Sequence, residues 1–128
     1  MQENLKQLLL IDLSARLPYG VICNTPKGNG HLNSINQTIF DIELGININA
    51  VHRDIFKLEE CKPYLRSMDS MTEDEKIEWD AEYAYNSKSY EYEEYLSKMI
   101  DWLNAHHFDY RGLIEKGLAL EAPKGKEE

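Results

Sequence analysis

The chain of 128 residues is 42% hydrophobic and 29% charged, with a formal net charge of −9 and a pI of about 4.9. This balance is typical of a soluble globular protein and excludes a disordered chain. The excess of acids opposes binding to bare nucleic acid or to an anionic membrane surface, where Lys and Arg supply the attraction. We therefore expect no direct contact with nucleic acid or membrane, whereas a basic protein partner suits the charge.

The two cysteines, Cys23 and Cys61, do not form a Cys-x-x-Cys pair and are too few for a disulfide framework. The apolar run at residues 8–11 is too short for a signal sequence or a membrane-spanning helix, and the charged residues Asp12 and Arg16 come soon after it. We expect reduced, partly buried thiols in a cytoplasmic protein.

The first predicted element is an amphipathic helix rich in leucine. Apolar residues recur at helical spacing along one face, and they are Leu5, Leu8, Leu9, Leu13 and Leu17. Pro18 and Gly20 predict the end of this helix, because Pro disfavours a helical residue before it and Gly interrupts a helix.

The next part of the chain predicts short strands. Residues 21–24 are an apolar run, Asn29-Gly30 is typical of a tight hairpin turn, and residues 31–36 should return as the second strand. Apolar and polar residues then alternate over 40–44 and again over 46–50. Short connections cannot cross between parallel strands, so these segments predict an antiparallel meander of three to five strands.

The segment KPYLR at residues 62–66 is predicted to be extended, because Pro63 lacks the backbone donor that a helix interior needs. A helix should come next and run to about Tyr85. Two phases of a capping box are open for its start, one pairing Ser70 with Glu73 and one pairing Thr72 with Glu75. Its predicted inward residues are Ile77, Ala81 and Ala84.

A second, stronger helix is predicted from a cap at Ser89 to a stop at residues 104–107, with acids in its first turn. Asp109 should cap a last short helix through the N–H groups of Arg111 or Gly112, and Gly117 should end or bend that helix. The residues predicted to share one core are Leu9, Leu13, Ile100, Leu103 and Leu113.

Together these elements predict an α+β fold: an N-terminal helix, a small antiparallel sheet of three to five strands, then two to three C-terminal helices. The length of the chain favours a single domain, which we place at residues 1–122. Residues 123–128 are predicted to form a charged flexible tail.

The pair His106 and His107, with Asp109 two residues later, is the first candidate site. It suggests a small enzyme or a metal-binding protein, because imidazole and carboxylate are common metal ligands. Against this, neighbouring residues on a helix point about 100° apart, so the two histidines cannot readily share one ion. The structural alternative is a helix C-terminus at which His bonds free carbonyls.

The second candidate is an acidic and aromatic surface. Residues 69–101 contain 11 acids and 3 Lys, a net of −8, and tyrosines alternate with the acids. The residues predicted to form an interaction face are Glu78, Glu82, Tyr83, Tyr85, Tyr90 and Glu94. In the alternative interpretation the tyrosines are buried or half-buried at a helix joint. No cofactor is predicted, since the glycines at 28 and 30 lack the Gly-Lys-Ser/Thr of a phosphate-binding loop.

Three stretches also resemble a known group of proteins: LPYGV at residues 17–21, KPYLR at 62–66 before SMTE at 70–73, and WLNAHHFDYRGLI at 102–114. With these motifs the chain resembles an uncharacterised family of small acidic proteins from gut Bacteroides-type bacteria and their phages or mobile elements. The resemblance covers nearly the whole chain and implies an accessory protein linked to a phage or mobile element, with no assigned activity or site residues to carry over. From the acidic helical face we expect a non-enzymatic role in protein–protein interaction.

Overall fold

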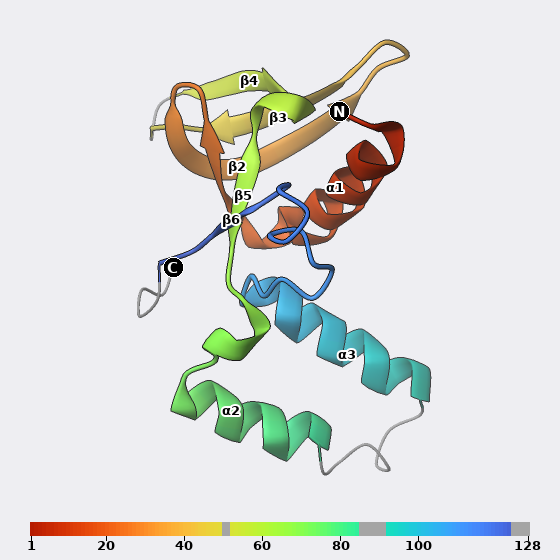
Figure 1. Cartoon of the computed structure of the whole chain (residues 1–128), viewed down its shortest axis with the longest axis vertical. Helices are drawn as coiled ribbons and strands as arrows, with labels where there is room; N and C mark the ends of the chain where they lie inside the picture. Colours follow the sequence, from red (N-terminus) through yellow and green to blue (C-terminus); the bar gives the residue numbers. More distant parts are fainter. Residues whose placement is uncertain (50–51, 85–91, 124–128) are drawn as a thin grey trace.

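A sheet at one end of the molecule and a pair of helices at the other are the two main parts of the computed structural model, which describes residues 1–49, 52–84 and 92–123 (Figure 1). The helices and strands run in the order α1 (Glu3–Arg16), β1 (Ile22–Thr25), β2 (Gly28–Gln37), β3 (Ile42–Asn47), β4 (Arg53–Lys57), β5 (Lys62–Leu65), α2 (Glu73–Trp79), α3 (Tyr92–Ala105) and β6 (Leu120–Glu121). Short 3-10 turns lie at Leu17–Tyr19, Leu58–Glu60 and Met68–Ser70, and a π-helical turn at Asp80–Ala84.

The sheet has the strand order β4-β3-β2-β1-β5-β6. The strands β1, β2 and β3 form the predicted antiparallel meander, β4 extends it by a strand that was not predicted, and β5 returns to pair with β1 in antiparallel fashion. The prediction of three to five antiparallel strands was wrong, because the described residues form six strands and the last pair is parallel, with Tyr64 opposite Leu120. The two helices lie between β5 and β6, and such a long connection is what parallel pairing requires.

The hairpin between β1 and β2 turns earlier than predicted. Thr25 pairs with Gly28, which leaves Pro26-Lys27 as the turn, and the Thr25 hydroxyl donates to the carbonyl of Gly28 at 2.6 Å. Gly30 lies inside β2, where a Cβ atom would come within 2.3 Å of the Asn47 carbonyl oxygen. The Asn29-Gly30 turn was therefore a wrong prediction: this glycine serves the close approach of two strands.

The predicted strands at 40–44 and 46–50 are one strand, β3, which begins at Ile42 and passes through Gly45. Phe40 is not in a strand: it lies with Ile39 at the β2–β3 turn, where their side chains are 90% and 91% exposed. The N–H of Thr38 closes this turn by donating a hydrogen bond to the Asp41 carbonyl at 2.8 Å. Alternation alone did not separate a strand end from the turn.

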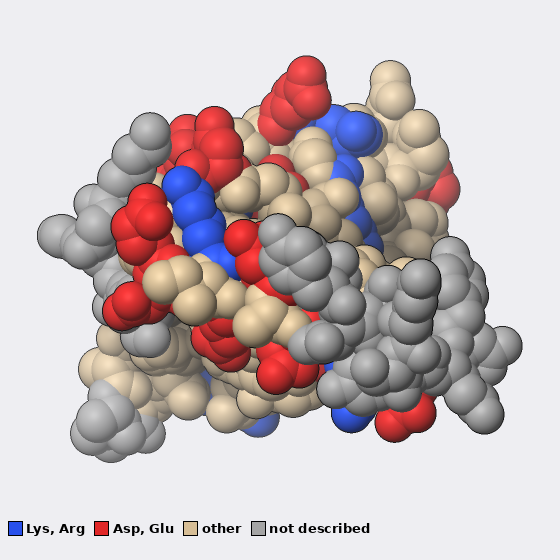
Figure 2. All heavy atoms as spheres, turned by 90° about the horizontal axis from the view of Figure 1, so that it is seen from below, with Lys and Arg blue, Asp and Glu red and all other residues tan. Residues whose placement is uncertain are grey.

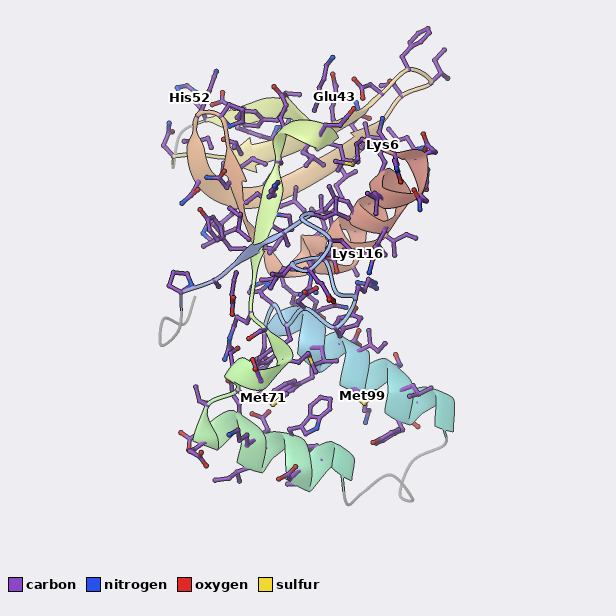
Figure 3. All side chains as sticks on the ribbon, in the orientation of Figure 1. Lys6, Glu43, His52, Met71, Met99 and Lys116 are labelled. Atoms are coloured by element: carbon purple, nitrogen blue, oxygen red, sulfur yellow. The ribbon has the colours of Figure 1, made fainter. Side chains whose placement is uncertain are left out.

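The apolar side chains form two clusters instead of the single predicted core. The first lies between α1 and the sheet and includes Leu9, Leu13 and Leu113. The second is built on Trp102, Leu103 and Phe108, against which Met71, Trp79 and Met99 pack between α2 and α3 (Figure 3). Ile100 belongs to neither, because its side chain is 37% exposed. The predicted sharing of one core is thus wrong for two of the five residues.

Helix α2 begins at the second of the two predicted capping boxes. Thr72 accepts from the Glu75 N–H at 3.2 Å, and the Glu75 carboxylate accepts from the Thr72 N–H at 2.9 Å. The inward face differs from the prediction: Ile77 is 66% exposed and Ala81 is also exposed, whereas Trp79 packs against Trp102. The side chain of Ala84 lies outside the described residues.

The predicted last short helix is absent from its place, where residues 113–117 form turns. Asp109 nevertheless caps them, because its carboxylate accepts from the N–H groups of Leu113 at 2.8 Å and Ile114 at 3.0 Å. The capping residue is the predicted one, but the N–H groups that it accepts from lie two residues later than predicted. Of the predicted tail, Pro123 is exposed and residues 124–128 lie outside the described part of the chain.

Candidate functional site

A cleft of about 870 Å³ lies where β5 leaves the sheet and runs toward the helices. Its lining comes from the β1–β2 hairpin, β5, the first turns of α2, the end of α3 and the segment after β6, and comprises Ile22, Asn29, Tyr64, Arg66, Thr72, Asp74, Glu75, Glu78, Ala105, His106, His107, Ala122 and Pro123. Figure 1 shows β5 running from the sheet toward α2 and the end of α3. The volume is that of a typical small-molecule site.

An ion pair between β5 and α2 forms one wall of the cleft. Arg66 donates twice to Glu75, at 2.8 Å and 2.6 Å, and its guanidinium lies 4.3 Å from the centre of the Phe108 ring. The hydrogen bonds from Arg66 lower the pKa of Glu75 from 4.5 to about 2. Both groups are therefore charged at neutral pH and satisfied by each other, so Arg66 contributes little free positive charge to the cleft.

His106 lies just beyond the end of α3. Its Nδ1 is 2.9 Å from the backbone oxygen of Trp102, and its ring stacks on the Trp102 ring at 4.1 Å between centroids. A carbonyl oxygen only accepts, so Nδ1 carries the proton, and in the neutral ring Nε2 carries the lone pair. The contact agrees with the structural alternative in which a histidine bonds a carbonyl at the helix end, but this carbonyl is not free, because it also accepts the backbone N–H of His106 at 3.1 Å.

His107 has a backbone conformation that favours glycine, with φ of 61°. The N–H of His107 bonds the Asn104 carbonyl at 3.1 Å, and the N–H of Phe108 bonds the Leu103 carbonyl at 2.9 Å. These are the two hydrogen bonds of a Schellman cap, with His107 in the usual glycine position. Burial lowers the pKa of His107 from 6.5 to about 4, so its ring is neutral at pH 7.

The structure does not gather the histidine pair and Asp109 into a metal site. Both carboxylate oxygens of Asp109 accept backbone N–H groups, and His106 uses one nitrogen on a carbonyl. Within residues 1–49, 52–84 and 92–123, no group of three His, Cys, Asp or Glu side chains is placed to hold a metal ion. His106 and His107 instead share the lining of the cleft.

The two cysteines are buried and free. Burial raises the pKa of the Cys23 thiol to about 12, and it does the same for Cys61. Both side chains therefore remain thiols at neutral pH, and a thiol is a poor nucleophile compared with a thiolate. They belong to the apolar cluster under the sheet.

The predicted interaction face is only partly described. Glu78, Glu82 and Glu94 are exposed, on α2, on the π-helical turn and on α3. Tyr85 and Tyr90 lie outside the described residues, as does the side chain of Tyr83. We define the acidic face as the exposed acids of these helical segments: Glu73, Asp74, Glu78, Asp80, Glu82, Glu94 and Asp101. Figure 2 shows this end of the molecule, where Asp and Glu cover more of the visible surface than Lys and Arg.

Sequence reasoning missed several residues of the cleft, above all Arg66 and Glu75. The capping-box pattern indicated the position of Glu75, but nothing in the spacing indicated that Arg66 would meet it. Tyr64 and Asn29 were also missed, and they are hydrogen-bonded at 3.3 Å although 35 residues separate them. The one available signal was the alternation of an extended segment, which places residues two apart, such as Tyr64 and Arg66, on the same side.

The chain has no match among protein-family models, curated proteins or solved structures. None of the helices in the described residues combines the length and the apolar character needed to cross a bilayer. The functional assignment therefore rests on the cleft, the acidic face and the charges they carry.

Proposed function

We propose that this chain is a non-enzymatic accessory protein that binds a basic protein partner through its acidic face. The resemblance to proteins of gut Bacteroides-type bacteria supports a role linked to a phage or mobile element. The alternative, an enzyme or metal-binding protein that uses His106, His107 and Asp109, has less support because the Asp109 carboxylate is occupied as a backbone cap.

The observation that carries the proposal is that five of the seven acids of the acidic face have no salt-bridge partner among the described residues. In the described parts of α2 and α3, Lys76 pairs with Glu73 and Lys98 with Glu94, each at 3.8 Å. No salt bridge within the described residues reaches Asp74, Asp80 or Glu82. Uncompensated acids on neighbouring helices create a negative potential that steers and binds basic proteins and repels phosphates.

The test is a charge reversal on the acidic face. A partner captured from host lysate is titrated with the wild-type chain and with the triple variant Glu73→Lys, Glu82→Lys and Glu94→Lys. Glu78 is left intact here, because its carboxylate accepts from the Trp102 indole at 3.0 Å. The triple variant should bind at least about tenfold more weakly, and binding should weaken as salt rises because exposed charges are screened over ~8 Å at 0.15 M.

The matched control reverses three exposed acids elsewhere, Glu3, Glu59 and Glu115, and so changes the net charge equally. This control should bind the partner nearly as well as the wild type. A partner whose affinity is unchanged both by added salt and by the acidic-face triple variant contradicts the proposal. Tight binding of duplex DNA at physiological salt would contradict the electrostatic argument as a whole.

A further inference from the structure

We propose that the cleft is a binding site for an arginine side chain of the basic partner, held by Asp74, Glu78 and His106. The inference rests on the proposed function, because it names the group on the partner that the acidic face recruits. It is also narrower, because it assigns the contact to one cleft and to one side chain. Three observations carry it: the charge of the lining, the acceptors that remain free, and the shape of the walls.

The charge of the cleft is negative, and its negative groups are concentrated on α2. The lining contains three carboxylates and one guanidinium, a net of −2 without the histidines. Arg66 is satisfied by Glu75, so the uncompensated pair is Asp74 and Glu78. These two residues are four apart and lie on the same side of α2. An anionic ligand is excluded by this arrangement, and a cation is favoured.

The acceptors that remain in the cleft match several donors at once. The Asp74 carboxylate accepts no hydrogen bond from the described residues. Glu78 accepts the Trp102 indole N–H at Oε2, which leaves Oε1 as an acceptor. His106 adds the lone pair of Nε2 as a third acceptor, because its Nδ1–H donates to the Trp102 carbonyl. A guanidinium offers five N–H donors in a planar fork, whereas an ammonium is a compact point charge, so this spread of acceptors favours arginine.

The neutral histidine and the aromatic walls agree with a cationic ligand. His107 carries no charge at pH 7, because burial lowers its pKa to about 4, and it therefore does not offset the carboxylates. The rings of His106 and Tyr64 line the cleft and supply flat surfaces, and the His106 ring is stacked on the Trp102 ring behind it. Guanidinium groups stack on such surfaces in addition to bonding carboxylates.

The experiment titrates the full chain with N-acetyl-arginine N-methylamide and follows the indole N–H resonance of Trp102 by NMR. The indole N–H donates to the Glu78 carboxylate, which lines the cleft, so its resonance responds to binding there. The neutral analogue N-acetyl-citrulline N-methylamide has nearly the same shape and lacks the charge. We expect a saturable shift with the arginine probe, a weaker response to the equivalent lysine probe, and none with citrulline at the same concentrations.

The variants Asp74→Asn and Glu78→Gln should each weaken binding of the arginine probe about tenfold, because each removes a charged acceptor. Glu115→Gln removes one exposed acid far along the chain from α2 and should leave the probe affinity unchanged. Circular dichroism of each variant verifies that it is folded, and the citrulline comparison tests the site without any variant.

A cleft that binds citrulline as well as arginine, or lysine as tightly as arginine, would overturn the assignment. Equal losses with Glu115→Gln and with the two cleft variants would also overturn it, since they would indicate diffuse attraction. These results would not contradict the proposed binding of a basic partner by the acidic face, because the triple variant that tests that proposal leaves Asp74 and Glu78 unchanged. Conversely, a basic partner that binds the acidic-face triple variant as tightly as the wild type contradicts the proposed function, even if the arginine probe binds in the cleft.

Discussion

At the scale of single residues, His107 is the least expected position in the chain. Most helices that end with this pair of hydrogen bonds carry glycine there, because a Cβ atom disfavours positive φ. Here the position is a histidine with φ of 61°, and its Nδ1 is buried without a hydrogen-bond partner in the described structure. Strained residues of this kind cluster at functional sites, and His107 lines the cleft.

We predict that His107→Gly is more stable than His107→Ala by about 1 kcal/mol. Both substitutions remove the imidazole, so their difference isolates the backbone conformation. The free energy of unfolding is measured for both variants by urea denaturation. If the two variants are equally stable, the backbone at this position does not adopt the left-handed conformation.

At the scale of elements, α2 is placed by its first turn. The chain offers two overlapping capping boxes, and the one that forms uses Thr72 and Glu75. The same Glu75 receives both hydrogen bonds from Arg66, so the choice of cap also joins the helix to the end of β5. Ser70 instead donates its hydroxyl to the Ser67 carbonyl at 2.7 Å. This cap orients Asp74 and Glu78 toward the cleft.

Thr72→Ala should therefore lower the free energy of unfolding by about 1 kcal/mol, because it leaves an N–H of the first turn without its acceptor. Ser70→Ala should have the smaller effect, since that hydroxyl caps no helix. The free energies of unfolding of the two variants, measured by thermal and urea denaturation, distinguish the Thr72–Glu75 capping box from the Ser70–Glu73 box. A larger loss with Ser70→Ala would mean that the helix begins at the other box.

At the scale of the whole molecule, buried charges connect parts that are distant in sequence. Asp12 and Arg16 of α1 are fully buried and paired at 2.8 Å. Arg16 also donates to the carbonyl of Phe108, and Arg111 donates to Asp12 at 2.8 Å. The first helix is thus tied to the segment just after α3. Breaking such a network leaves a buried charge uncompensated, which is strongly destabilising.

The pH dependence of stability should follow from two groups whose pKa values fall on folding. Between pH 6.5 and about 4, the unfolded chain binds a proton on His107 that the folded chain does not, so stability falls as the pH falls. Glu75 extends the loss from pH 4.5 to about 2. Urea midpoints at pH 7, 5 and 3 should decline stepwise. His107→Gln should flatten the upper part of this decline and Glu75→Gln the lower part, whereas unchanged slopes would contradict these assignments.

Local pattern was sufficient for much of the fold. The leucine spacing predicted α1, and apolar runs with short connections predicted the antiparallel meander of β1 to β3. The Thr72–Glu75 pair was one of the two predicted starts of α2, and Asp109 was correctly expected to cap backbone N–H groups, although the predicted helix and the predicted N–H partners were wrong. These features depend on neighbours within a few residues, so the order of side chains along the chain determines them.

The cleft and the parallel strand pair were decided by tertiary structure. Tyr64 and Leu120 become neighbours only because the chain returns to the sheet after two helices. Arg66 finds Glu75 because β5 projects beyond the sheet toward the first turn of α2. Such pairings have no local periodicity, since they depend on how buried surfaces and charges are satisfied across the whole chain. The sequence by itself determined the positions of α1, α2 and α3, most of the meander and the acidic character. Packing determined which charged groups meet and which remain free to bind.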